Sequence, residues 1–233
     1  MRPAAAGIAA VLLAVAACSG DDDDAGTTTT DPEPTETSVG LDHTPTTQPP
    51  ETGGIEVPDI PGTFTAAIPS LGFGIAVPEG WQATVLSEDA IERLEAATLS
   101  QPSFLDAARN VMASGAVFYA AGIDDEGRVS ELKVDVQDGA DASPESVAAL
   151  ANSIAESGKV EDATVTDDLG DGRIRVDYRL PAPDGDADHA GIETIGSQLF
   201  VPDGDRVWSF IVTSEDTASQ DALLAIFEAS ITF

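Results

Sequence analysis

Cysteine and histidine are nearly absent from this chain of 233 residues, which has one cysteine and two histidines. A single cysteine cannot form an internal disulfide, so the fold has to be stabilised by a packed core. Aromatic residues are also few, at 5% of the chain. Most of them fall on expected strands or on the expected last helix, where packing between layers would use them.

Basic residues are scarce as well. The chain has 42 acidic residues against 10 basic ones, a formal net charge of -32, and its only lysines are Lys133 and Lys159. A surface this acidic repels nucleic acid phosphates and anionic lipid head groups, so we expect no nucleic acid partner. Solubility, a saline habitat or a high-GC genome would explain the acidity, and a cationic partner is the alternative.

No apolar run is long enough for a transmembrane helix. The longest, from Ala4, is about 14 residues, whereas a helix needs about 20 to cross a bilayer. Arg2 precedes this run and Val15-Ala16-Ala17-Cys18 stands at its end, which is the order of a signal peptide with a lipoprotein cleavage site. We expect residues 1–17 to be cleaved and Cys18 to carry acyl chains that hold the protein on the extracytoplasmic face of the cell membrane. A secreted protein with a free cysteine, or an uncleaved anchor, is the alternative.

Composition divides the rest of the chain in two. Residues 18–60 are rich in Asp, Thr and Pro and contain no Lys or Arg. Such a segment cannot bury enough apolar surface to fold, and we predict a disordered acidic tether. Residues 61–233 have the length and apolar content of a single globular domain.

Capping signals and hydrophobic periodicity predict the elements of this domain. Helices are expected after Ser87, from Pro102 to Met112, after Ser143-Pro144-Glu145 and over residues 217–230. Alternating or continuous apolar runs predict strands at residues 73–77, 116–123, 129–136, 161–168, 173–180, 192–201 and 207–213. Short connections between strands make them antiparallel neighbours, so we expect an α+β fold with an antiparallel sheet covered by helices.

Two segments resemble a known family. The opening Gly72-Phe73-Gly74-Ile75-Ala76-Val77-Pro78-Glu79-Gly80-Trp81 and the closing Ile226-Phe227-Glu228-Ala229-Ser230-Ile231-Thr232-Phe233 resemble the PsbP-like superfamily, especially its actinobacterial lipoproteins of the LpqN type. The resemblance implies an α-β-α sandwich around an antiparallel sheet. It also implies an accessory or binding role, and it supplies no active-site motif.

Catalytic and metal motifs are weak. His43 lies in the tether, and His189 sits among turn-forming residues where a solvated loop histidine is expected. Asp184, Asp186 and Asp188 have the spacing of the first ligands of a calcium loop, but His189 and Ile195 replace its glycine and its glutamate. At most a weak cation site is expected there. The sequence predicts no cofactor, because no glycine-rich loop opens a helix.

Three classes of function remain. We expect a non-catalytic binding or accessory module for an apolar, lipid or glycan ligand, or for a protein partner, in the cell envelope. The alternatives are a hydrolase of envelope glycans that works through two carboxylates, and a purely structural surface lipoprotein. The expected binding surface lies between the sheet and the helix that carries Phe104, Leu105, Val111 and Met112, because this helix has more apolar bulk than the short helix before it. Packing of these side chains in the core is the competing interpretation.

Overall fold

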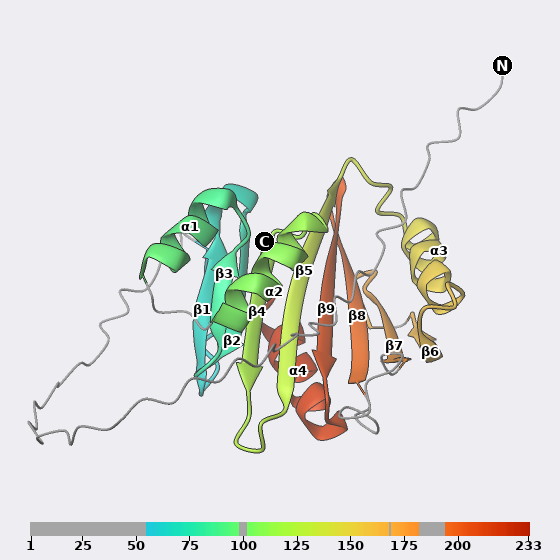
Figure 1. The fold of residues 1–233 in the computed structure, drawn as a ribbon. Coiled ribbons are helices and arrows are strands. Elements are labelled where there is room, and N and C mark those ends of the chain that lie inside the picture. The colour runs from blue at the N-terminus through green and yellow to red at the C-terminus, as the bar shows by residue number, and fades with distance from the viewer. Residues whose placement is uncertain (1–54, 98–101, 168, 182–193) are drawn as a thin grey trace, which may run out of the picture.

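The computed structural model describes residues 55–97, 102–167, 169–181 and 194–233. In these ranges the chain forms a two-stranded sheet, a seven-stranded sheet and four α-helices (Figure 1). The strands are β1 (Thr63–Ile68), β2 (Phe73–Pro78), β3 (Gln82–Val85), β4 (Phe118–Ile123), β5 (Val129–Asp138), β6 (Glu161–Thr166), β7 (Ile174–Leu180), β8 (Thr194–Asp203) and β9 (Arg206–Ser214). The helices are α1 (Glu88–Ala97), α2 (Pro102–Ala113), α3 (Pro144–Ala155) and α4 (Thr217–Ser230).

The large sheet has the strand order β3-β4-β5-β9-β8-β7-β6, and every neighbouring pair is antiparallel. The predicted α+β class, an antiparallel sheet covered by helices, is therefore confirmed. None of the helices in the described ranges is long and apolar enough to span a bilayer.

Two helices begin at the caps predicted from the sequence, Ser87 and Ser143, and a third begins at Asp216. The Ser87 hydroxyl accepts a hydrogen bond from the Ala90 N–H at 3.2 Å, which caps α1. Ser143 caps α3 in the same way, with Pro144 as its first residue, and the Asp216 carboxylate accepts from the Ser219 N–H at 2.8 Å at the start of α4. These side chains satisfy backbone donors that a helix leaves free at its N-terminus.

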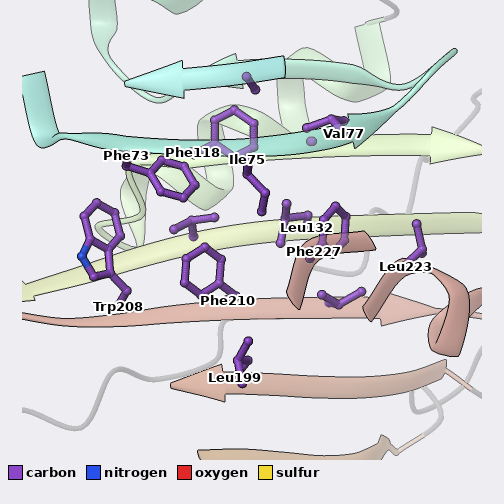
Figure 2. Packing of buried hydrophobic residues seen from close by; sticks show 14 of the residues in the cluster. Phe73, Ile75, Val77, Phe118, Leu132, Leu199, Trp208, Phe210, Leu223 and Phe227 are labelled. Atoms are coloured by element: carbon purple, nitrogen blue, oxygen red, sulfur yellow. The ribbon is translucent and has the colours of Figure 1, made fainter. Parts of the chain in front are cut away.

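One face of the large sheet is covered by α4 together with the β1–β2 hairpin. Their shared core is the largest hydrophobic cluster of the described residues, and Phe73, Trp208 and Phe210 lie at its centre (Figure 2). Strands β1 and β3 were not predicted from the sequence, and neither was the separate hairpin. Ile55 and Val57, which precede the expected start of the domain at residue 61, pack against this hairpin. A Cβ on Gly74 would lie only 2.8 Å and 2.6 Å from their Cγ2 atoms, respectively.

The opposite face carries the other three helices. Helices α1 and α2 pack over β4, where Tyr119 and Phe104 belong to one cluster, and α3 packs over β7, where Val147 and Val176 belong to another. The layers thus follow the α-β-α order. In Figure 1, β9 and β8 run between α2 and α3. The middle of this face is therefore flanked by helices on both sides.

Candidate ligand-binding cavity

A cavity of about 260 Å³ opens on the middle of the sheet beside α3. We call it the α3 cavity. Its apolar lining includes Leu150, Ile154, Val160, Phe200 and Val207, and its polar lining includes Asp135, Gln198 and Ser209. Apolar walls with a few convergent polar groups are typical of small-molecule sites.

The strand register brings the floor of the cavity together. Asp135 on β5 is the Cα partner of Ser209 on β9, and Ser209 is in turn the partner of Phe200 on β8. Because side chains of neighbouring paired residues point to the same face, these three residues form one row across the sheet. Gln198 lies two residues before Phe200 on β8 and therefore points to the same face.

The polar groups on this floor are buried and incompletely paired. Asp135, Gln198 and Ser209 are 8%, 4% and 9% exposed. Gln198 Nε2 donates a hydrogen bond to Ser209 Oγ at 2.6 Å. Within the described part of the chain, Gln198 Oε1 and both carboxylate oxygens of Asp135 have no hydrogen-bond partner. Buried polar atoms are normally satisfied, so an unpaired group in a cavity wall marks a place where a ligand atom can bind.

One lysine lies close to Asp135 on the same strand. Lys133 Nζ is 3.4 Å from Asp135 Oδ2, and both side chains are largely buried. Burial raises the pKa of the Asp135 carboxyl, and Lys133 opposes that rise only in part. The raised pKa means that the charged carboxylate of Asp135 lowers the stability of the folded protein relative to the protonated form.

This cost predicts an unusual pH dependence. Because the folded-state pKa of Asp135 lies above its ordinary value of 3.8, the penalty is present at neutral pH and disappears as the pH falls through the folded pKa. We expect Asp135→Asn to unfold at the same or a slightly higher urea concentration than the wild type at pH 7. Any advantage should shrink to nothing as the pH is lowered toward 4.

Asp138→Asn is the matched control for this measurement, since Asp138 lies on the same strand and is exposed. Urea midpoints measured across the pH range would decide. A clear loss of stability in Asp135→Asn at pH 7 would show that the carboxylate stabilises the fold, and would contradict a raised pKa.

The residues predicted on α2 take part in packing and in a second cavity. Phe104 is 7% exposed, and its ring stacks on Tyr119 with a centroid distance of 5.3 Å. Val111 and Met112 are half-buried against the same cluster, and Leu105 is half-buried too. A cavity of about 270 Å³ lies between α2 and the ends of β4 and β5, and of the four predicted residues Phe104 lines it.

This α2 cavity is the weaker candidate of the two. Its lining includes Ile123 and Val129, which are 60% and 39% exposed. Glu131 on its floor accepts a hydrogen bond from the Tyr119 hydroxyl. One residue of its lining, Gln82, has a buried oxygen without a hydrogen-bond partner, whereas the lining of the α3 cavity has such oxygens on both Asp135 and Gln198.

Several predicted sites lie outside the described residues. They are the lipidation residue Cys18, the weak cation ligands Asp184, Asp186 and Asp188, and the loop histidine His189. Within the described ranges, no group of three or more His, Cys, Asp or Glu side chains could hold a metal ion.

The floor of the α3 cavity was not predicted from the sequence. In β5 the polar residues Lys133, Asp135 and Gln137 alternate with the apolar residues Leu132 and Val134. Such alternation is typical of a strand with one face packed on the core and the other exposed to solvent. A carboxylate in the middle of a long strand could have pointed to this site, but only the tertiary fold shows that Asp135 is buried.

The comparisons with known proteins concern the fold. No family model matches the chain, and no curated protein matches it. Among solved structures 14 chains match. One is the solution structure of cyanobacterial PsbP (CyanoP) from Synechocystis sp. PCC 6803, with a TM-score of 0.41 and 9% sequence identity over 75% of this chain and 95% of that chain.

Proposed function

We propose that the domain is a non-catalytic binding module that holds a small apolar or amphipathic molecule in the α3 cavity. The main support for this proposal is that the apolar wall formed by α3 faces buried polar atoms of Asp135 and Gln198 that lack hydrogen-bond partners in the described chain. The wall would bury the apolar part of a ligand, and the polar floor would fix its orientation. The cavity volume of about 260 Å³ suits one small ligand or the end of a larger one.

The proposal includes a cellular setting. The protein is an exported lipoprotein of the LpqN type, held at the extracytoplasmic face of the cell membrane by acyl chains on Cys18. The signal-like residues 1–18 and the resemblance of the two end segments support this assignment. The acidic tether would let the domain search the envelope near its anchor for a lipid, a glycan or a protein partner.

The hydrolase alternative has less support. Glycoside hydrolysis uses two carboxyl groups placed on either side of the scissile bond. Among the described residues that line the α3 cavity, Asp135 is the only one with a carboxylate. A single carboxylate at this site favours binding without turnover.

Covering the opening of the cavity should weaken ligand binding. Ser153 lies on the rim of the α3 cavity, on the exposed side of α3, so that Ser153→Trp can place an indole over the opening without disturbing the core. The probe is N-phenyl-1-naphthylamine, a neutral dye that brightens in apolar surroundings. We expect saturable fluorescence with the wild type and binding weaker by about tenfold or more in Ser153→Trp, a loss of about 1.4 kcal/mol.

Asn152→Trp is the control for this experiment. Asn152 is the neighbouring residue on α3, is exposed and does not line the cavity. It adds the same indole to the same helix, and we expect it to bind the dye like the wild type. Equal binding by all three proteins, or no saturable binding by the wild type, would refute the proposed site.

A further inference from the structure

We infer that the α3 cavity selects the ammonium group of an amphipathic amine, with the amine on the sheet floor and its apolar chain along α3. This inference rests on the proposed binding function and names its ligand class. Three features of the cavity carry it: unpaired acceptor atoms, the ends of two helices and the charges around the site.

The unpaired atoms on the floor are acceptors. Asp135 Oδ1 and Gln198 Oε1 are buried and lack a hydrogen-bond partner in the described chain, and Asp135 Oδ2 faces only the Lys133 ammonium, at 3.4 Å. An ammonium group brings three N–H donors, whereas a hydroxyl brings one O–H and a carboxylate brings none. Hydrogen bonds from a charged donor to a carboxylate are about twice as strong as neutral ones.

Two helices end at the cavity. The cavity lining includes Ser114 and Gly115, which follow the last residue of α2. It also includes Ile154, in the last turn of α3, and Ser157, which follows that helix. Neither helix has a basic residue in its last turn. The C-terminus of a helix carries about half a negative charge, so both helices favour a cation at this place.

The nearby lysines leave room for a ligand cation. Lys133 Nζ is 3.4 Å from Asp135 Oδ2, which is longer than the roughly 2.7–2.9 Å of a charge-assisted hydrogen bond, and Oδ1 has no partner in the described chain. Lys159 also lines the cavity, but it is an exposed residue in the turn that follows α3. An exposed lysine keeps its ammonium group in water while its stem covers apolar surface.

An anionic head group would be attracted by Lys133 and Lys159 but repelled by the carboxylate on the floor and by the helix C-termini. A carboxylate or phosphate would face Asp135 and both helix C-termini. It would also meet a chain whose formal net charge is -32. A cation gains from each of these negative groups.

The test compares three ligands with the same chain and different heads: hexylammonium, 1-hexanol and hexanoate. Each is titrated into the full-length chain carrying Cys18→Ala, and affinities are taken from amide chemical shifts of Gln198, Ser209 and neighbouring residues. High salt is used throughout to screen the general attraction of cations to an acidic protein. We expect hexylammonium to bind about tenfold more tightly than 1-hexanol, and hexanoate to bind most weakly.

Two variants show whether the preference comes from the cavity floor. Asp135→Asn should bring hexylammonium down to the affinity of 1-hexanol, whereas Asp138→Asn on the same strand should leave the preference unchanged. Lys133→Gln removes the competing ammonium, and we expect it to tighten hexylammonium binding without tightening 1-hexanol binding.

The outcomes separate this inference from the proposed function. If the three ligands bind equally well, or if the amine preference survives in Asp135→Asn, the head-group inference is wrong and the cavity remains a binding site. If none of the three ligands shifts the residues of the cavity, both the inference and the proposed function fail.

Discussion

Phe73→Ala should lower the free energy of unfolding by about 3–5 kcal/mol, the usual cost of removing a fully buried phenylalanine from a core. Phe73 is 0% exposed and belongs to the β1–β2 hairpin. Its ring stacks on Trp208 at 5.0 Å and lies 5.7 Å from Phe210, so it joins the hairpin to the centre of the large sheet (Figure 2). The remaining aromatic side chains cannot close a cavity of that size without strain. A domain of ordinary stability would lose a large part of its 5–15 kcal/mol.

Phe64→Ala is the matched control, because Phe64 lies on the other strand of the same hairpin and is 37% exposed. We expect it to cost about 1 kcal/mol or less. Urea unfolding followed by tryptophan fluorescence and by circular dichroism would measure both variants. Similar small losses for Phe73→Ala and Phe64→Ala would mean that the hairpin is not part of the core.

Helices with strong local signals could be predicted from the sequence almost to the residue. Ser143-Pro144-Glu145 combines a cap, a proline at the first helical position and an acid in the first turn, and α3 begins at Pro144. The last helix was expected over residues 217–230, and α4 spans Thr217–Ser230. In these segments the local preferences and the tertiary fold agree, which is why the sequence was sufficient.

Strands β1 and β3 could not be predicted for a physical reason. Strand β1 includes the alanine pair Ala66-Ala67, and β3 is a four-residue edge strand, so neither shows a strong β pattern. Pairing determines both of them: β1 is fixed by β2, and β3 is fixed by β4. Such pairings depend on contacts between segments and leave little trace in a single sequence.

The candidate site was harder to predict than the fold. The predicted binding surface was chosen for the apolar side chains of α2. The Phe104 ring stacks on Tyr119, however, so these side chains belong largely to the hydrophobic core. The polar floor of the α3 cavity, in contrast, looks like an ordinary solvated strand face until α3 is placed beside it. A cavity depends on what neighbouring helices leave uncovered, and hydrophobic periodicity does not report this.

Replacing the single cysteine should change where the protein is found. If Cys18 carries the acyl chains, each buried CH₂ group contributes about 0.8 kcal/mol to membrane binding, and Cys18→Ala removes all of that contribution. The formal net charge of -32 opposes adsorption of the protein to anionic lipids.

We therefore expect the wild type to partition into the detergent phase and the membrane pellet, and Cys18→Ala to move almost entirely to the aqueous and soluble fractions. Ser19→Ala is the control, because it changes the next residue and keeps the cysteine. Mass spectrometry of the N-terminal peptide of the wild type should find the acyl chains on Cys18. Equal membrane retention of Cys18→Ala and wild type, together with no acyl chains on Cys18 of the wild type, would exclude the lipid anchor.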